Sequence, residues 1–428
     1  MKKFSKDFLI GAATAAHQVE GNNKNSDCWA CEQMKYTNYK EPSLDAVDHY
    51  HLYEEDIQLM AQAGLNAYRF GIEWARIQPT AETFDFGATQ HYKNVIDCCK
   101  KNGLEPIPTL MHFSSPKWLI EKGGWEAETV PADFARYTRY IMEQMGSELH
   151  YVCTINEANM GVQVAALMER FKKQMMARAA AAKTDGTVQM GMNVEQMMAN
   201  QQNAAAENLQ VFGTAQPQCF TNPRSRRGDE LVIEAHKAAR AVIREICPQT
   251  KVGLTLSLHD IQALPGGETI AEKEWADEFV HYLPALMDDD FLGVQNYTRS
   301  QYDSEGIRTT PEGAELTQMD YEFYPQALEN VLRRVAQNFK GDLLVTENGI
   351  ATSDDKRREA FIEGALAGVQ RCRMDGLPVK GYLYWSLLDN FEWQKGFGMT
   401  FGLVAVDRAH GQKRTPKPSL NYLGSWRE

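Results

Sequence analysis

Several features are scarce or missing in this chain, and each absence excludes a class of protein. No apolar run approaches the roughly 20 residues that cross a bilayer, so we predict no membrane span. Acidic residues outnumber basic ones, 57 to 45, and the net charge of −12 argues against a nucleic-acid partner or an anionic membrane surface. No glycine-rich phosphate loop follows the first apolar segment, which disfavours a doubly wound dinucleotide-binding fold.

The eight cysteines also lack the dense spacing of small secreted scaffolds. Cys28 and Cys31 form one isolated CxxC pair, and Cys98 and Cys99 are adjacent in the chain. Neither pair has a second half with zinc spacing. We therefore predict ordinary thiols, no bound metal and a reducing, cytoplasmic location.

The start of the chain imitates a secretory signal, because MKK precedes the short apolar stretch FLIGAATAA. Lys6 and Asp7 interrupt this start, however, and the apolar stretch makes a good first strand that cleavage would destroy. We therefore favour a strand over a cleaved signal.

The strongest positive pattern is an alternation of helical and strand-like segments along the 428 residues, 43% of which are apolar. Amphipathic stretches end at a glycine or polar stop and lead into short runs rich in β-formers. Residues 49–63, for example, reach Gly64 before the run LNAYRFGIEW. The predicted strands are FLIGAAT, LNAYRFGIEW, LEPIPTLMHF, YVCTINE, KVGLTLSL, FLGVQNY, LLVTENG and VKGYLYWSLLD. The predicted helices cover 49–63, 90–102, 132–148, 229–247, 325–339 and 355–375.

Eight strands joined by helices favour an α/β fold of the (β/α)8 TIM-barrel type, which tolerates insertions past about 400 residues. We predict one catalytic domain over residues 1–428, because no linker or low-complexity boundary divides the chain. Between about 160 and 215 the alternation breaks into runs of Ala, Gln and Asn that hold eight of the 18 methionines. We interpret this stretch as a mainly helical insert after the fourth strand, either forming part of the wall above the barrel mouth or simply packed onto the barrel.

In such a barrel the side chains at the carboxyl ends of the strands face the cavity, and two of them are carboxylates. Glu157 in TINEAN and Glu347 in TENG end the fourth and seventh predicted strands. Two carboxyl groups about 5–5.5 Å apart suit a retaining glycosidase, in which one attacks the sugar and the other protonates the leaving oxygen. If Glu347 is ionised, its charge should keep Glu157 protonated for the first step, which would suit Glu347 to attack and Glu157 to act as acid and then base.

The other polar and aromatic residues of the rim fit a sugar ligand. Arg69 is placed to hold Glu347 ionised, because a guanidinium favours the charged carboxylate. Tyr297 is placed to donate to the same group, and we also predict that the neutral amide of Asn296 supports this nucleophile. The remaining candidates supply neutral hydrogen bonds, a carboxylate for two adjacent hydroxyls, or flat faces for stacking on the ring. They are Gln18, His112, Asn156, Trp385, Glu392 and Trp393.

Taken in order, seven segments closely resemble family 1 glycoside hydrolases: FLIGAATAAHQVEG, DHYHLYEEDIQLMAQAGLNAYRFGIEWARIQP, TLMHF, TINEAN, NYTR, TENG and YWSLLDNFEW. The resemblance covers about residues 4–158 and 229–424. It implies a (β/α)8 barrel that needs no cofactor or metal, with Glu157 as acid/base and Glu347 as nucleophile. It also implies that Gln18, His112, Asn156, Glu392 and Trp393 bind the sugar, that Trp385 is its platform, and that Tyr297 touches the nucleophile.

The resemblance also bears on the glycone. Phospho-sugar members of the family carry a serine in place of the Glu of the E-W pair, whereas this chain keeps Glu392, whose charge would repel a sugar phosphate. We therefore predict a retaining, exo-acting β-glycosidase whose partner is a small β-glycoside or oligosaccharide, most simply a β-D-glucoside. Galactose or fucose as the glycone, transglycosylation, and a catalytically silent carbohydrate-binding barrel remain alternatives. Homo-oligomerisation is left open.

Some positions depart from the usual family pattern without removing a reacting group. His17 stands where tyrosine is common, Phe113 where tryptophan is common, Gly71 where serine is common, and Ala158 where proline normally follows the acid/base. The insert matches the family poorly. Its basic residues leave an acidic or aromatic aglycone open, although a solvated helix face explains them more simply. These residues are Arg170, Lys172, Lys173 and Arg178.

Overall fold

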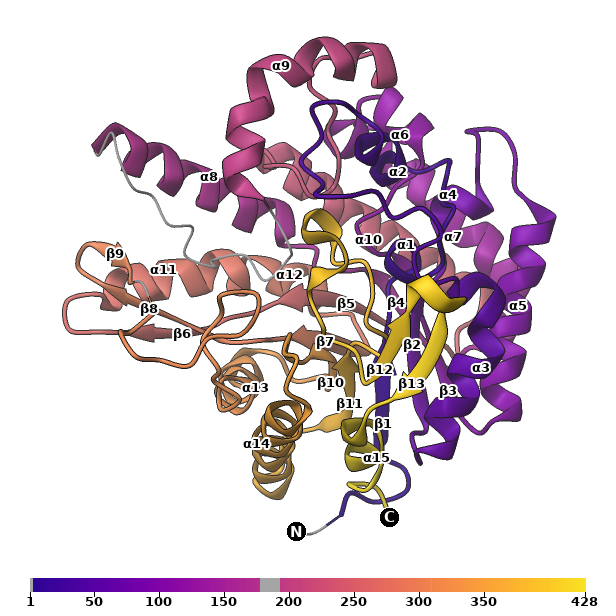
Figure 1. The fold of residues 1–428 in the computed structure, drawn as a ribbon, viewed down its shortest axis with the longest axis vertical. Coiled ribbons are helices and arrows are strands. Elements are labelled where there is room, and N and C mark those ends of the chain that lie inside the picture. The colour runs from indigo at the N-terminus through magenta and orange to yellow at the C-terminus, as the bar shows by residue number, and fades with distance from the viewer. Residues whose placement is uncertain (1–2, 178–192, 309) are drawn as a thin grey trace.

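The computed structural model describes residues 3–177, 193–308 and 310–428, and its centre is a closed barrel of eight parallel strands (Figure 1). In sequence order the strands are neighbours, and the last closes onto the first through pairs from Leu9–Gly381 to Ala13–Trp385. This arrangement confirms the predicted fold and all eight predicted strands. They are β1 (Leu9–Ala13), β2 (Ala67–Gly71), β3 (Glu105–Met111), β4 (Tyr151–Ile155), β5 (Lys251–Ser257), β7 (Phe291–Gln295), β10 (Asp342–Asn348) and β11 (Val379–Trp385).

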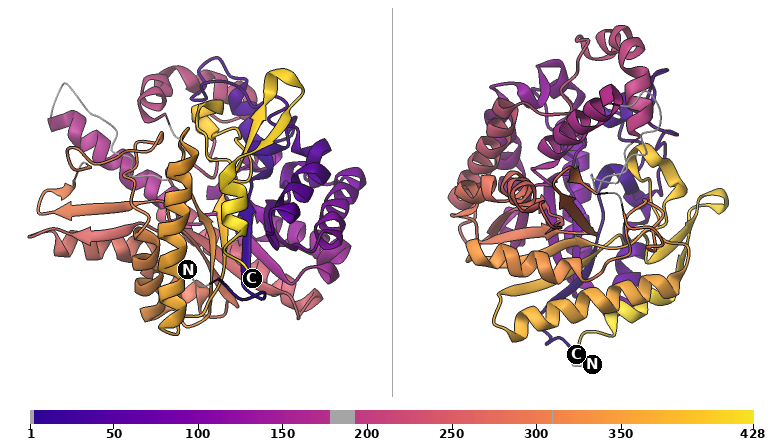
Figure 2. Two further views of the ribbon diagram at one scale, coloured as in Figure 1. Left: turned by 60° about the horizontal axis from the view of Figure 1, so that its bottom comes forward. Right: turned by 90° about the vertical axis from the view of Figure 1, so that its left-hand side faces the viewer.

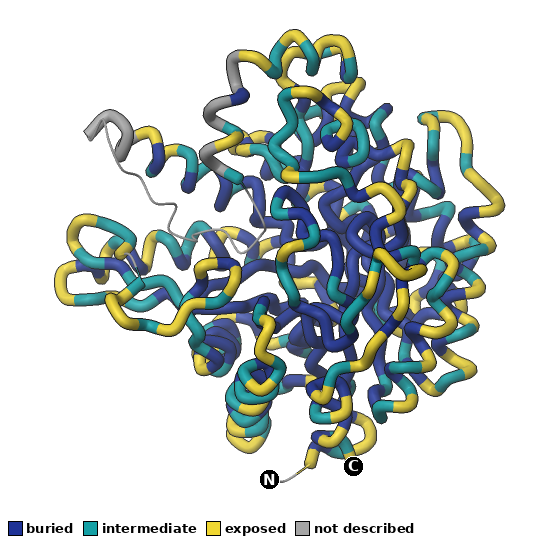
Figure 3. Tube along the Cα trace, viewed as in Figure 1, coloured by how far each residue is buried: buried dark blue, intermediate teal, exposed yellow. Residues whose placement is uncertain are grey.

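The predicted helices surround this barrel (Figures 1 and 2). They are α3 (His49–Gln62), α5 (Phe86–Lys101), α7 (Val130–Met145), α10 (Arg226–Ile246), α13 (Ala327–Asn338) and α14 (Asp355–Met374). The side chains of Asp85, Ser225 and Asp354 cap α5, α10 and α14 by accepting backbone N–H bonds of the first turn. Burial is concentrated in the barrel and on the inner helix faces (Figure 3). Within the described ranges, no helix is both long and apolar enough to span a membrane.

The shorter elements were not predicted. Most have only four to seven residues, too few to show a periodicity, and α11 was missed although it has 11 residues. They include α1 (Ala16–Val19), α2 (Asp27–Glu32), α4 (Trp74–Ile77), α6 (Lys117–Glu121), α11 (Glu268–Glu278), α12 (Leu283–Leu286) and α15 (Pro418–Gly424). The 3-10 turns in the described ranges are η1 (Gly124–Glu126), η2 (Gly146–Glu148), η3 (Val280–Tyr282), η4 (Trp393–Gly398) and η5 (Arg408–His410). Outside the barrel, β6 (Asp260–Ala263), β8 (Arg299–Asp303) and β9 (Gly306–Ile307) form one small sheet, and β12 (Val404–Asp407) pairs with β13 (Lys413–Pro416).

The stretch between β4 and α10 contains two helices, α8 (Met160–Ala177) and α9 (Val194–Phe212), so the predicted insert is helical where it is described. Residues 178–192 of the insert lie outside the described ranges. The N-terminal part of α9 packs against the loop that follows α2: Asn200 Nδ2 donates to the Thr37 carbonyl at 2.8 Å. Further along α9, Glu207 accepts the Lys35 and Tyr36 N–H groups at 2.7 and 3.0 Å. Both segments follow carboxyl ends of barrel strands, so α9 forms part of the wall at that end (Figure 1).

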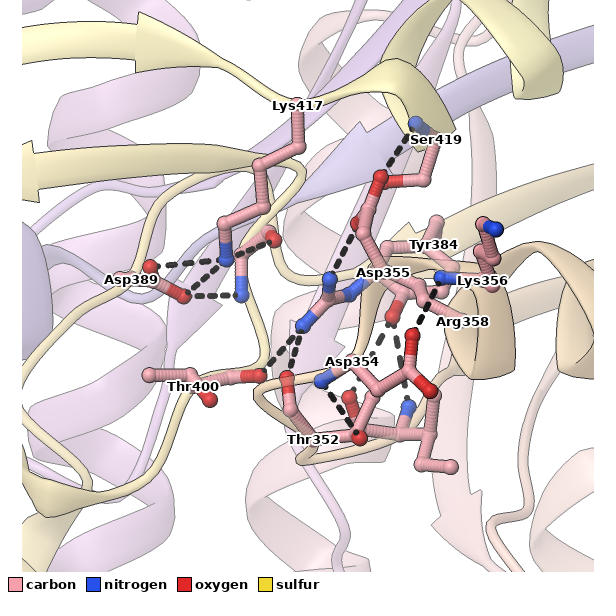
Figure 4. Close-up of polar contacts among 12 residues, drawn as sticks. Thr352, Asp354, Asp355, Lys356, Arg358, Tyr384, Asp389, Thr400, Lys417 and Ser419 are labelled. Carbon is pink, nitrogen blue, oxygen red and sulfur yellow. Dashed lines mark hydrogen bonds and ion pairs between the residues drawn. The ribbon is translucent and has the colours of Figure 1, made fainter.

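A buried arginine ties the loops that follow β10 and β11 to the C-terminal segment (Figure 4). Arg358 of α14 is fully buried and donates to the Thr352 and Thr400 carbonyls at 2.6 and 2.7 Å. It also pairs with Asp355, which accepts the backbone N–H and hydroxyl of Ser419 at 2.8 and 2.7 Å. The loop after β11 is thereby fixed to α14 and α15.

We expect Arg358→Met to lower the free energy of unfolding by roughly 3 kcal/mol, because it leaves two partly buried carbonyls without this donor and removes the buried cation paired with Asp355. The matched control is Arg357→Met, one residue away. Arg357 pairs with Glu315 at 2.7 Å on the surface, and its loss should cost about 1 kcal/mol or less. Urea unfolding of both variants measures the difference. Equal decreases in the free energy of unfolding for the two variants would show that the buried contacts of Arg358 stabilise the fold no more than the surface ion pair of Arg357.

Candidate active site

Glu157 and Glu347 line one small pocket at the carboxyl ends of the strands. Glu157 follows β4 and Glu347 lies in β10, and each is only 3% exposed. The pocket is also lined by His112, Phe113, Tyr297, Trp385, Glu392, Trp393 and Phe401. The fold therefore gathers in one pocket seven of the eleven predicted site residues, which come from strands far apart in the sequence.

Hydrogen-bond donors surround the Glu347 carboxylate. Arg69 Nη1 lies 2.5 Å from Glu347 Oε1, and Gln295 Nε2 donates to the same oxygen at 2.9 Å. The Tyr297 hydroxyl donates to Oε2 at 2.6 Å. Burial has the largest effect and raises the pKa of Glu347 above its usual value, although Arg69 and the Tyr297 hydroxyl act to lower it. These three donors favour the ionised, nucleophilic form.

Asn156 joins the same network from the end of β4. Its Oδ1 accepts from Arg69 Nη2 at 2.6 Å and from Gln295 Nε2 at 2.7 Å. Its Nδ2 is buried and has no hydrogen-bond partner in the described part of the chain. With its oxygen so occupied, the amide keeps its nitrogen available as a donor, as a sugar hydroxyl requires.

Gln295 is a site residue that the sequence analysis missed. It occupies the last position of β7, two residues before Tyr297, and bridges Asn156 and Glu347. The two-residue spacing was a usable signal, because alternate residues of a strand face the same side.

Glu157 differs electrostatically from its partner. Its pKa is raised well above the ordinary value, first by burial and then by the charge of Glu347, while Arg69 opposes the shift. Its backbone has a φ of +43°, a left-handed conformation that is uncommon outside glycine and often found at functional sites. The Glu157 N–H donates to Thr255 Oγ1 at 3.0 Å. A carboxyl that stays protonated at higher pH is suited to donate a proton.

The departure at Ala158 has a local explanation. The Ala158 N–H donates to the Thr255 carbonyl at 3.1 Å, which links the loop after Glu157 to β5. A proline at this position would lack the donor. Alanine therefore gives the acid/base loop an anchor that the usual family residue does not have.

Three further predicted residues supply neutral or acidic groups at the pocket. Gln18 Nε2 donates to the Phe391 carbonyl at 2.7 Å and to Glu392 Oε2 at 3.2 Å. His112 Nε2 lies 3.8 Å from Glu347 Oε1. Burial and the charge of Arg69 hold the pKa of His112 well below its usual value, so this contact involves a neutral imidazole.

Stacked rings form the aromatic side of the pocket. Trp385 stacks on His112 with ring centroids 5.6 Å apart, and Phe113 meets Trp393 edge to face at 5.2 Å. Behind Trp393, the His17 ring lies nearly parallel at 5.8 Å. Burial opposes protonation of His17, but the charge of Glu32, whose Oε1 is 2.6 Å from Nε2, raises the His17 pKa. A protonated imidazole is a favourable partner for an indole face, which gives the replacement of tyrosine by His17 a physical reason.

We predicted that the side chain of Asn296 supports the nucleophile, but the structure places it elsewhere. Its Nδ2 donates to the Leu258 and Thr298 carbonyls at 2.8 and 2.9 Å, and only its backbone N–H reaches Glu347, at the carbonyl oxygen, 3.2 Å away. Buried carbonyls at strand ends require donors, and here the amide satisfies two of them. Asn296 thus stabilises the ends of the strands rather than the carboxylate.

The two basic residues of the insert whose side chains the structure describes do not line the pocket. Arg170 Nη2 pairs with Glu274 at 2.5 Å, and Lys172 is exposed. The side chains of Lys173 and Arg178 lie outside the described part of the chain. The paired and exposed positions agree with a solvated helix face and give no support to an acidic aglycone.

Hydrogen-bond donors, not metal ligands, surround Glu347. Over residues 3–177, 193–308 and 310–428, no three His, Cys, Asp or Glu side chains are arranged to hold a metal ion. The groups closest to Glu347 are a guanidinium, a phenol and a carboxamide nitrogen.

A closed parallel barrel with two buried carboxylates at its carboxyl rim defines an enzyme of the glycoside hydrolase class. The model of glycosyl hydrolase family 1 matches residues 1–427, and the chain belongs to this family. This confirms the family that the sequence motifs indicated.

Relatives span the whole chain. A solved structure of β-glycosidase BGL167 is 42% identical, with a TM-score of 0.86 over 99% of this chain and 96% of that one. Coniferin β-glucosidase of Pinus contorta is 28% identical over 98% of this chain and 91% of its own length. The 6-phospho-β-galactosidase of Lacticaseibacillus casei is 29% identical over 99% of this chain and 98% of its own length. The chain is thus similar both to enzymes named for plain glycosides and to one named for a phosphorylated glycoside.

Proposed function

We propose that this protein is a retaining, exo-acting β-glycosidase that releases the terminal non-reducing sugar of a small β-glycoside or oligosaccharide, with β-D-glucosides as its preferred substrates. One observation carries the proposal. Glu347 is held by Arg69 and Tyr297 in the same pocket as Glu157, whose pKa is raised well above its usual value. Such a pair separates the roles of nucleophile and acid.

In the first step, the Glu347 carboxylate attacks the anomeric carbon while Glu157 gives its proton to the glycosidic oxygen. The bond to the aglycone breaks, and a bond between the sugar and Glu347 forms. Glu347 loses its charge in this ester, which removes one cause of the raised Glu157 pKa. The deprotonated Glu157 then accepts a proton from water, and the water oxygen displaces Glu347 from the same face that the aglycone left.

The remaining residues of the pocket bind the sugar in this proposal. Glu392, oriented by Gln18, accepts hydrogen bonds from two hydroxyls, and Asn156 Nδ2 and the neutral His112 add further polar contacts. Trp385 and Trp393 lie against the C–H faces of the ring. The pocket is small, which supports removal of a single terminal sugar rather than binding along an extended groove.

Glu392 supports an unphosphorylated glycone, although one relative is a 6-phospho-β-galactosidase. The side chain is 3% exposed, and a buried carboxylate repels a dianionic phosphate strongly, since little water screens it. The relative's name therefore does not decide the substrate of this chain, whereas the charge in its own pocket does bear on it.

Glycone preference is tested by comparing nitrophenyl β-D-glucoside with its 6-phosphate. We expect kcat/KM to be about 100-fold or more higher for the uncharged substrate than for the 6-phosphate. Glu392→Ser should reduce that ratio, because it lowers kcat/KM for the uncharged substrate and raises kcat/KM for the phosphorylated one. β-D-Galactoside and β-D-fucoside in the same panel rank the other glycones. A wild-type preference for the phosphorylated substrate would refute the glycone assignment.

Two alternatives share this scaffold. Transglycosylation uses the same covalent intermediate, so product analysis with an added alcohol separates it from hydrolysis. A catalytically silent sugar-binding barrel would bind glucosides without turning them over.

We further propose that residues 1–428 form one catalytic domain. We also propose that the protein acts in the cytoplasm, and the sparse spacing of its cysteines supports this location.

A further inference from the structure

A second cavity, of about 440 Å³, lies beside the active site. It is formed by α2 and the loop after it, by α9, and by residues 215–223. In the described part of the chain it shares no lining residue with the pocket of Glu157 and Glu347. Its lining is rich in sulfur, which the proposed glycosidase mechanism does not use. The sulfur-bearing residues are Cys28, Cys31, Met34, Met168, Met197 and Cys219.

Two of these thiols come from distant parts of the sequence and line the cavity together. Cys31 on α2 and Cys219 after α9 are each partly exposed, and the interaction between the two thiols raises the pKa of Cys219. Cys28, the other member of the CxxC pair, is buried, and its thiol interacts with the Tyr39 hydroxyl instead. Sequence spacing suggests Cys28 as the partner of Cys31. However, Cys28 is buried, whereas Cys31 and Cys219 are both partly exposed to solvent.

The backbone on both sides of this thiol pair is held in place. At the start of α2, Asp27 Oδ1 accepts the Ser115 N–H at 2.8 Å. On the other side, the Gln218 carbonyl accepts the Trp125 N–H at 2.9 Å, and the Cys219 carbonyl accepts the Asn222 N–H at 3.1 Å. A disulfide forms readily only where two Cβ atoms are already close. Here both backbones are fixed, and the two thiols line the same cavity and interact with one another.

We propose that Cys31 and Cys219 are a modification site, at which the two thiols form a reversible disulfide by exchange with a low-molecular-weight disulfide such as oxidised glutathione. In the first step the Cys31 thiolate attacks one sulfur of the small disulfide, releases one small thiol and leaves a mixed disulfide on Cys31. Cys219 then loses its proton and attacks the Cys31 sulfur, releasing the second small thiol. Two protein thiols are oxidised and one small disulfide is reduced to two thiols.

The order of the steps follows from the surroundings of each thiol. Contact with Cys31 and burial raise the pKa of the Cys219 thiol, so Cys219 supplies little thiolate for the first attack. Exchange should therefore accelerate as the pH rises. The finished bond fastens α2 to the segment that follows α9. That helix is preceded by Asn193, whose N–H donates to Gln394 Oε1 at 2.7 Å, next to Trp393 of the active site.

The test incubates the full chain in glutathione buffers of increasing oxidised fraction, blocks free thiols with iodoacetamide and maps the peptides by mass spectrometry. We expect a linked peptide containing Cys31 and Cys219 that dithiothreitol removes, and a rise in the thermal midpoint of about 2 °C or more on oxidation. Cys31→Ser and Cys219→Ser should each lose both effects. Cys98→Ser is the matched control, because Cys98 is also partly exposed but does not line the cavity, and it should keep both.

Three outcomes overturn the proposal: a disulfide between Cys28 and Cys31, glutathione retained on Cys31 without closure, or no cross-link in any buffer. Because the readout is a covalent bond and not turnover, it is independent of whether the glycosidase assignment is correct.

Discussion

Glu347→Ala is expected to lower kcat for nitrophenyl β-D-glucoside by roughly 10⁴-fold or more, because no other group can form the bond to the anomeric carbon. The exposed Glu312→Ala serves as the matched control and should retain wild-type rates, since Glu312 lies outside the pocket lining. Activity of Glu347→Ala near the wild-type level would exclude Glu347 as the nucleophile.

Stereochemistry gives this prediction a second, sharper readout. Removing the Glu347 carboxylate leaves space for a small anion on the face of the sugar opposite the aglycone, so added azide should restore activity and yield the α-glycosyl azide. In Glu157→Ala the nucleophile remains, the sugar ester forms first, and azide should yield the β-glycosyl azide. The same anomer from both variants would show that the two roles are assigned wrongly.

Glu157→Gln is expected to show an effect that depends on the leaving group. For an alkyl glucoside, whose alcohol must be protonated to leave, the first step should slow by about 10²–10⁴-fold. For a dinitrophenyl glucoside, whose phenolate leaves unaided, the first step should be nearly unchanged, and the sugar ester should accumulate as a burst of phenolate. A uniform loss over both substrates would argue for a binding role of Glu157 instead.

The pH profile checks the same assignment. Activity needs Glu347 ionised and Glu157 protonated, so the acid limb of kcat/KM reports loss of a proton from the pair and the basic limb reports the second loss. Burial and the Glu347 charge raise the Glu157 pKa, which extends activity toward higher pH and ends it as the pH passes that pKa. Glu157→Gln should abolish the basic limb and keep the acid limb. A basic limb that persists in this variant must belong to another group.

The barrel and the position of its reacting groups were predictable because both depend on local sequence patterns, namely periodicity and the residues at strand ends. The eight strand runs and the six helices differ in periodicity, and a polar residue at a strand end can be placed at the rim once closure is assumed. Glu157, Glu347 and Tyr297 were placed at the rim on this basis alone, and all three line the pocket. The short helices and the β6, β8 and β9 sheet have too few residues for such a pattern.

The partner of each side chain could not be predicted in the same way. Asn296 and Gln295 are neighbours in the sequence with similar amides, yet Gln295 contacts Glu347 while Asn296 turns to the Leu258 and Thr298 carbonyls. Consecutive strand residues face opposite sides, and which side is crowded with unpaired carbonyls depends on neighbouring strands. The same is true of Cys31, whose thiol lines a cavity with Cys219, a residue far away in the sequence, and interacts with it.

Sequence alone therefore determined the order of strands and helices, the family, and the two carboxylates proposed to react. It did so because periodicity, motif order and residue type are local properties of the chain. The tertiary structure decided which donors surround Glu347, why the pKa of Glu157 is raised, and which thiols meet. These properties depend on distances of a few ångströms between residues that are far apart along the chain, and such distances exist only once the barrel has closed.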